Sequence, residues 1–412
     1  MGSGVYILGG YQTDFSANWA RNGWELADGM REVLEQGLAS TGLETQDLDT
    51  AHVGNFAGEL FCNQGHLGGL LAAALPGLAG IPASRHEGAC ASGSLAALAA
   101  GAEIEAGRYG LAAVVGIEQM RNVPGDQAAQ LIGPTAMWAG HECIGIKYPW
   151  PHVFSELAGE YERRYGLRYE HLARIAEINF GNARRNPNAQ TRRWEFNERS
   201  FTADDAANPV IDGRMRKQDC GQVSDGAAVV FLASEAVARA WAQRQGRSFG
   251  SVSRIEGWGH RTAPITYDAK IALSAGEPYV FPFVRATITD AFRRAGISGV
   301  EQIDGIETHD CFTSTQYMAI DHFGITPPGQ SGQAIESGDI EIGGRIPMNP
   351  SGGLIGLGHP VGATGARMLL DCHKQVTGTA GGYQVDGARR FATLNIGGSA
   401  TTTVSFIVGR AA

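Results

Sequence analysis

The chain has few cysteines and no paired cysteine motif. Six cysteines are spread over 412 residues, and none forms a Cys-x-x-Cys pair. No signal-peptide pattern precedes the first apolar run, at residues 5–8. A disulfide framework would need an oxidising compartment and a denser set of cysteines. We therefore expect reduced thiols and a cytoplasmic location.

Long hydrophobic runs and an excess of positive charge are also missing. The longest apolar stretch, residues 67–82, is rich in glycine, interrupted by Pro76 and too short to span a bilayer. The net charge is −9, so no basic surface for nucleic acid is expected. With 43% hydrophobic and 18% charged residues, the composition is that of a globular protein with room for more than one domain-sized unit.

Apolar strands alternate with amphipathic helices, which favours a layered α/β fold. A helix is predicted over residues 24–41 and a strand over 48–54, and the same order returns as a helix over 284–295 and a strand from 303. This parallel indicates an internal duplication.

The stretch 123–216 differs from both copies. It carries most of the arginine, asparagine and aromatic residues, and helices are predicted over 155–165 and 169–185. We interpret it as an inserted, mostly helical subdomain, after which a strand at 227–232 returns the chain to the sheet.

The first chemical motif is the glycine-rich stretch 349–366, which places His359 among six glycines. So much glycine suits a backbone with unusual dihedrals or close approach to a ligand, and Pro360 fixes the next φ. This favours a catalytic histidine, although a plain glycine-rich turn is the alternative.

Cys90 lies among small residues just before a predicted helix over residues 95–106. Unpaired N–H groups at a helix start would stabilise its thiolate, so we predict a nucleophile; a buried structural thiol is the alternative.

His309, Asp310 and Cys311 end a later strand, and consecutive strand residues point to opposite faces, so we expect no metal site there. Backbone N–H groups near Gly397 could face an oxyanion, or form a simple turn.

Together these motifs resemble the thiolase family over essentially the whole chain. The Cys-x-Ser of residues 90–92, the Gly-His-Pro of 358–360 and the order of elements match that family. The His-Asp-Cys-Phe of residues 309–312, and Asn395 where most thiolases carry a second catalytic cysteine, resemble the sterol-carrier-protein-type subgroup.

The resemblance implies a thiolase fold, in which two duplicated βαβαβαββ halves form αβαβα layers with an inserted, mostly helical loop domain. The N-terminal half would comprise residues 1–122 and 217–264, the loop domain 123–216 and the C-terminal half 265–412. Thiolases also form dimers or dimers of dimers, so a homodimer or homotetramer is expected.

The resemblance further implies the chemistry. Cys90 would carry the acyl group, His359 would act as its base, and Cys311 would replace the missing acid/base thiol. His309 and His359 would form one oxyanion hole, and the backbone N–H groups of Cys90 and Gly397 the other. The reaction would be thiolytic cleavage of 3-ketoacyl-CoA to acetyl-CoA, as in fatty acid β-oxidation, or the reverse Claisen condensation.

Coenzyme A would be the co-substrate, and we expect no metal or redox cofactor. Arg214, Arg216 and Lys217 could pair with its phosphates, or form a solvated basic turn. Gly257 replaces a serine that contacts pantetheine in many thiolases.

Two other functions remain as alternatives. One is a thiolase-like acyltransferase or retro-aldolase that works with a small OB-fold partner; Cys90 argues against the aldolase. The other is a non-catalytic lipid-binding or scaffold relative, against which the complete set of candidate site residues argues.

Overall fold

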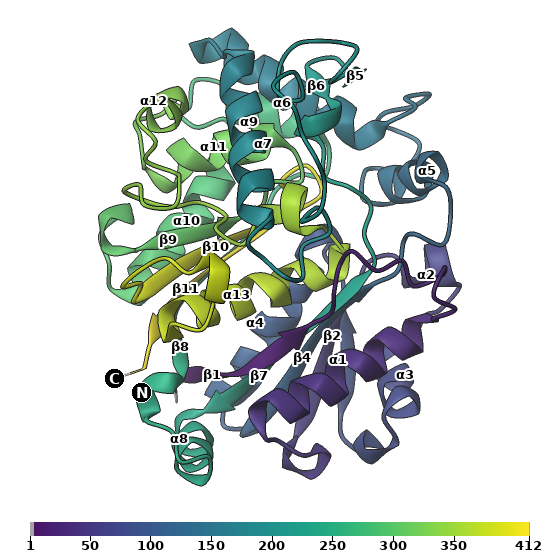
Figure 1. Cartoon of the computed structure of the whole chain (residues 1–412), viewed down its shortest axis with the longest axis vertical. Coiled ribbons are helices and arrows are strands. Elements are labelled where there is room, and N and C mark those ends of the chain that lie inside the picture. The colour runs from purple at the N-terminus through teal and green to yellow at the C-terminus, as the bar shows by residue number, and fades with distance from the viewer. Residues whose placement is uncertain (1–3, 412) are drawn as a thin grey trace.

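A computed structural model describes residues 4–411 and confirms the layered α/β architecture (Figure 1). In the N-terminal half the strands lie in the order β3, β2, β4, β7, β1. β2 runs parallel to β3 and β4, whereas β7 runs antiparallel to β4 and β1. These strands are β1 (Val5–Gln12), β2 (Thr50–Gly54), β3 (Ala83–His86), β4 (Leu111–Glu118) and β7 (Gly226–Ser234).

The C-terminal half repeats this order as β9, β10, β11, β8. Its strands are β8 (Ser253–Thr262), β9 (Gly305–Thr308), β10 (Arg390–Gly397) and β11 (Thr402–Arg410). Met348 forms an isolated parallel bridge with Ile306, at the position that β3 occupies in the first half. The predicted duplication is thus visible in the strand order.

The two halves meet where β1 pairs with β8, from Val5 opposite Ile255 to Ile7 opposite Ser253. We placed β8 in the N-terminal half, but it pairs along its length with β11. By this pairing β8 is the first strand of the second copy, and the junction lies between β7 and β8. The sequence hid this because only one α-helix, residues 235–244, lies between β7 and β8.

Helices form three layers around these strands. α4 (Ser92–Glu105) and α13 (Thr364–Thr377) lie side by side between the two halves of the sheet, where α13 contacts strands of both (Figure 1). The close approach needs glycine, because a Cβ on Gly365 would lie 2.2 Å from the backbone nitrogen of Ser94. The outer layers are α1 (Leu26–Thr41), α3 (Leu67–Ala74) and α8 (Glu235–Arg244) on one side and α10 (Pro282–Ala295) on the other.

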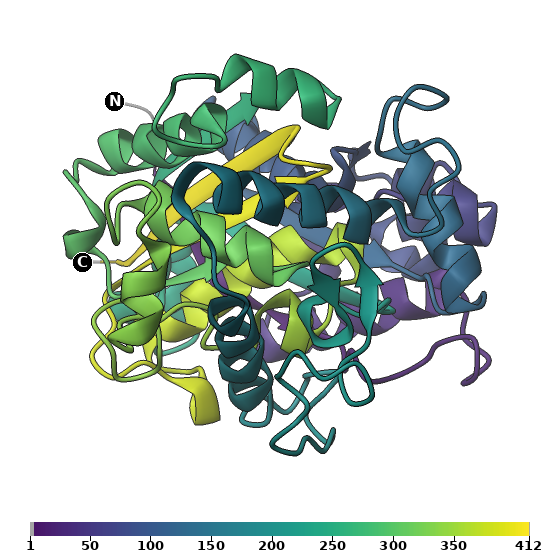
Figure 2. The same cartoon turned by 90° about the horizontal axis from the view of Figure 1, so that it is seen from above.

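The segment predicted as an insertion covers one end of the layers (Figure 2), but its helices make up less than half of it, because residues 184–209 form turns and coil. α6 (Pro149–Tyr165) and α7 (Tyr169–Ala183) pack on α11 (Thr313–Phe323), and their apolar side chains share one core with the C-terminal half. The remaining elements are α2 (Gly58–Cys62), α5 (Gly125–Thr135), β5 (Val210–Asp212), β6 (Met215–Arg216), α9 (Tyr267–Leu273) and α12 (Ser331–Glu336).

Predicted and observed helices agree closely except in the insertion. α6 begins at Pro149, earlier than the expected residue 155, because proline is well suited to the first turn of a helix. All six cysteines are free thiols, as expected. Within residues 4–411, no helix combines the length and the apolar character needed to cross a bilayer.

Candidate active site

Cys90 sits on a sharp bend at the start of α4. Ala89 has a left-handed φ of 50°, which is uncommon for a residue with a side chain. The Ser92 hydroxyl holds this bend, because it donates to the carbonyl of Ala89 at 2.6 Å and accepts from the N–H of Gly88 at 3.0 Å. The serine of the Cys-x-Ser motif therefore fixes the backbone that presents the sulfur.

His359 is presented by the glycine-rich loop that leads into α13. Gly358 has a φ of 119°, which a residue with a side chain rarely adopts, and the N–H of His359 donates to the Ser224 hydroxyl at 2.8 Å. The buried carboxylate of Glu118 accepts from the N–H of Gly362 at 3.0 Å. Two contacts from the N-terminal half thus fix the backbone around the histidine.

His309 and Cys311 follow β9, and Asp310 between them points away to a structural role. The Asp310 carboxylate accepts from the N–H of Leu354 at 2.5 Å and from the side-chain amide of Asn179 at 2.7 Å. It therefore ties the glycine-rich loop to the loop domain. The two neighbours of Asp310 are left to serve the site.

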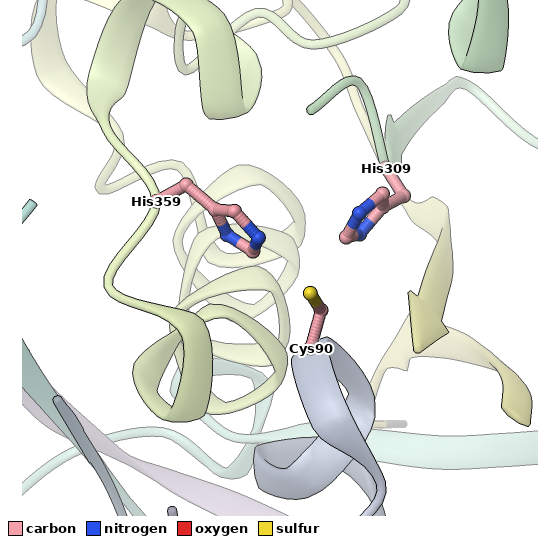
Figure 3. A group of neighbouring side chains, drawn as sticks. All are labelled: Cys90, His309 and His359. Carbon is pink, nitrogen blue, oxygen red and sulfur yellow. The ribbon is translucent and has the colours of Figure 1, made fainter. Parts of the chain in front are cut away.

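The structure brings Cys90, His309 and His359 together from three distant parts of the chain (Figure 3). The sulfur and one ring nitrogen of each histidine lie within 4.8 Å of one another. The two rings meet edge to face, with centroids 5.2 Å apart. These donor types could also bind a metal ion, and the same arrangement allows protons to pass between a thiol and an imidazole.

The hydrogen bonds of His359 assign its tautomer. Its Nδ1 lies 2.7 Å from the Thr364 hydroxyl, which itself donates to the carbonyl of Pro360 at 3.1 Å. The hydroxyl proton is thereby used, so Nδ1 of His359 must carry a proton and donate. Nε2 of His359 is then a free base, and it is buried without a partner among the described residues.

Asn395 assigns the opposite tautomer to His309. The amide oxygen of Asn395 accepts from the Ser94 hydroxyl at 2.8 Å, so its nitrogen donates to the carbonyl of Cys90 at 3.0 Å and to Nδ1 of His309 at 3.3 Å. Since Nδ1 of His309 accepts, its Nε2 carries the proton. One imidazole is therefore a base and the other a hydrogen-bond donor.

Burial keeps all these groups neutral at rest. It lowers the pKa of His359 to about 3, helped by the positive charge of Arg367, and it also lowers the pKa of His309. Burial raises the pKa of Cys90 to about 12 and raises that of Cys311. We expected a helix-stabilised thiolate at Cys90; instead desolvation outweighs the backbone N–H groups, so Cys90 rests as a thiol.

An apolar cavity of about 160 Å³ opens onto three of these four groups. Cys90, Cys311 and His359 line its reactive end together with Gly398. Burial is the larger influence on the Cys90 thiol, and the backbone N–H groups of Gly398 and of Cys90 itself oppose it by lowering the pKa. The aromatic wall consists of Phe56, Tyr148, Trp150, Phe154 and Phe312.

Four predicted positions lie less directly at the cavity. Gly397 pairs with Thr402 at the end of β10, and its neighbour Gly398 lines the cavity beside Cys90, so the oxyanion role of Gly397 stays a prediction. Arg214 forms an ion pair with Glu162, and Arg216 lies 2.7 Å from Asp205. Arg214, Arg216 and Lys217 are all absent from the cavity wall, so their role with coenzyme A stays a prediction.

Sequence reasoning missed the residues that orient the site. Asn395 was interpreted only as the position where a second catalytic cysteine is missing. In the structure the Asn395 side-chain amide contacts both Cys90 and His309. Thr364 lies five residues after His359. A helical turn beginning at Pro360 would bring its hydroxyl near the imidazole, so the sequence could have suggested the contact between Thr364 and His359. Ser94 offered no such signal.

Comparison with known proteins gives a consistent result. The family description "Thiolase, N-terminal domain" matches residues 5–236, and "Thiolase C-terminal domain-like" matches residues 269–410. An acetyl-CoA acetyltransferase of Methanothermobacter thermautotrophicus is 31% identical over 98% of this chain and 99% of its own length. Human sterol carrier protein 2 is 29% identical over 97% of this chain and 71% of its own length.

Solved structures share the fold at lower identity. An Ltp2-ChsH2(DUF35) aldolase superposes with a TM-score of 0.78 at 19% identity, covering 99% of this chain and 98% of the other. The acetyl-CoA acetyltransferase from Syntrophomonas wolfei gives a TM-score of 0.72 at 14% identity, with full coverage of both chains.

Proposed function

This chain belongs to the thiolase family, and we propose that it is an acyltransferase that cleaves 3-ketoacyl-CoA with coenzyme A, or runs the reverse Claisen condensation, through an acyl group on Cys90. The observation that carries the proposal is the trio of a thiol, a free imidazole base and an imidazole donor at one end of an apolar cavity. Each group has the protonation state that its step needs.

In the first step Nε2 of His359 takes the thiol proton as the Cys90 sulfur attacks the 3-keto carbon. The resting pKa of the thiol lies well above that of the imidazole, so proton transfer from Cys90 to His359 is unfavourable by itself. The proton therefore moves as the new C–S bond forms. Backbone N–H groups of Cys90 and of the Gly397–Gly398 turn would stabilise the oxyanion on the attacked carbon, and Cys90 and Gly398 both line the cavity.

In the second step the bond between carbons 2 and 3 breaks, which leaves the acyl group on Cys90 and expels the enolate of acetyl-CoA. Protonated Nε2 of His359 and Nε2–H of His309 would donate to the enolate oxygen. The Cys311 thiol then gives its proton to the enolate carbon. Cys311 suits this role because it faces the same cavity as Cys90 and is a neutral acid at rest.

In the third step the Cys311 thiolate takes the proton of coenzyme A, whose sulfur attacks the acyl-Cys90 thioester. The Cys90 sulfur leaves and recovers its proton from His359, so every group returns to its starting state. The same steps in reverse condense two acyl-CoA molecules.

The apolar wall supports a proposal for the acyl group. A cavity of about 150 Å³ lined by apolar side chains accommodates benzene, and the volume here is about 160 Å³. Pantetheine carries amides that need polar partners, whereas this wall is mainly aromatic and aliphatic. We therefore assign it to the acyl chain and expect substituents up to the size of a benzene ring.

Coenzyme A itself would enter near the loop domain. Of the three basic residues considered, Lys217 is exposed and forms no ion pair within the described chain, so it is the proposed phosphate contact. We also propose that the protein is located in the cytoplasm, forms a homodimer or homotetramer and acts in lipid metabolism.

The purified chain alone provides the test. With acetoacetyl-CoA and coenzyme A it should form two acetyl-CoA per substrate consumed, and Cys90→Ala should abolish the reaction. A wild-type chain that is inactive until a small OB-fold protein is added would instead support the partner-dependent acyltransferase. Inactivity in both conditions would refute the proposal.

A further inference from the structure

A buried lysine lies directly behind the turn that carries the Gly398 N–H. Lys270, on α9, is 3% exposed, and no carboxylate forms an ion pair with it among residues 4–411. Burying an amine without a counter-ion is costly, and it lowers the pKa of Lys270 to about 7.

The two hydrogen bonds of Lys270 clamp this turn to a neighbouring segment. Its Nζ donates to the Ser399 hydroxyl at 2.5 Å and to the carbonyl of Ile265 at 2.9 Å. Ser399 follows Gly398 in the connection between β10 and β11. The amine therefore contacts the residue next to Gly398, which lines the reactive cavity together with Cys90.

The turn needs such a clamp because its backbone is strained. Gly398 has a φ of 63°, and Ala400, which has a side chain, has a φ of 65°. A left-handed residue with a side chain costs about 1–2 kcal/mol, so the surrounding structure must hold it in place. The backbone contact of Ala263 with Thr401 holds the far end of the turn, at 2.7 Å, and Lys270 holds its middle.

We propose that Lys270 is a positioning residue that holds the Ser399 turn so that the Gly398 N–H stays aimed at the oxyanion formed on Cys90. It touches neither substrate nor sulfur and acts through Ser399. The inference rests on the proposed function, since it concerns the acyl transfer step at that same site.

Two reactions of Cys90 separate this role from a general structural one. Acyl transfer develops an oxyanion and depends on the turn, whereas alkylation by iodoacetamide needs the thiol and His359 but no oxyanion donor. Lys270→Met should slow single-turnover acylation by acetyl-CoA by about 10- to 100-fold. Deleting an oxyanion donor outright costs about 10²–10³-fold, and here the donor is only displaced. The alkylation rate should stay within about twofold of wild type.

Ser399→Ala removes the acceptor and leaves the amine, so it provides a second variant if Lys270→Met does not fold. Ser399→Ala should likewise slow acylation and leave alkylation unchanged. The double variant should be no slower than the slower single variant, because both substitutions remove the same contact. Lys147→Met, at an exposed lysine in the loop domain, is the matched control.

The outcomes are distinct. If the wild-type protein is not acylated, the proposed function fails. If wild type is acylated and both Lys270→Met and Ser399→Ala match it, the clamp has no role. An equal loss of acylation and alkylation would show that Lys270 supports the whole site and would also overturn the inference.

Discussion

Replacing Thr364 by valine tests the protonation state of His359. The change keeps the shape of a buried side chain but removes the hydroxyl that lies 2.7 Å from Nδ1 of His359. Nδ1–H would then have no acceptor, and an unsatisfied buried donor costs about 1–3 kcal/mol. The imidazole reduces this cost by moving its proton to Nε2, on the side of the Cys90 sulfur, which is a weak acceptor, and there it can no longer act as a base toward Cys90.

That free energy corresponds to a factor of about 5 to 150 in the population of the reactive tautomer. We therefore expect Thr364→Val to slow acylation of Cys90 by acetyl-CoA by this factor, measured as a single turnover in a quench experiment. Iodoacetamide alkylation should slow as well, because it needs the same base.

Thr403→Val is the control, since its buried hydroxyl has no partner among the described residues. It should leave both rates unchanged. Acylation of Thr364→Val within twofold of wild type would refute the tautomer assignment.

Three further outcomes are expected. Cys311→Ala should still form acyl-Cys90 but lose the exchange of acetyl-CoA methyl protons with deuterated water; normal exchange would place the acid elsewhere. Along a series of 3-ketoacyl-CoA substrates, kcat/KM should rise by about fourfold per added methylene until the cavity is full, and Trp150→Ala, but not exposed Trp138→Ala, should shift the optimum to longer chains. Burial holds the pKa of Lys270 at about 7, below its unfolded value of 10.5, so the unfolded chain binds more protons between these pH values. Denaturant unfolding should therefore show wild type gaining stability over Lys270→Met as pH rises through that range, by at most about 1.4 kcal/mol per pH unit. A difference in the free energy of unfolding that does not change with pH would contradict the lowered pKa of Lys270.

The sequence predicted the fold where a motif has a local cause. The helix after Cys90, the helices over residues 24–41 and 284–295 and the duplicated strand order all follow from periodicity and turn residues. The assignment of β8 differed, because strand pairing is a long-range property that periodicity does not encode.

The reactive residues were also identifiable, but their protonation states were not. Cys90 precedes a helix, which predicts a low pKa, and the opposing effect of burial depends on the side chains that surround the cavity. In the same way, Asn395 and Ser94 orient His309 only because β10 and α4, 301 residues apart at this contact, meet in the folded protein.

The mass of the Cys90 peptide tests the central claim most directly. After brief incubation with acetyl-CoA and acid quench, the wild-type peptide should carry one acetyl group, which added coenzyme A removes, and Cys90→Ala should carry none. An unmodified Cys90 peptide in a chain that still turns over acetoacetyl-CoA would contradict the account.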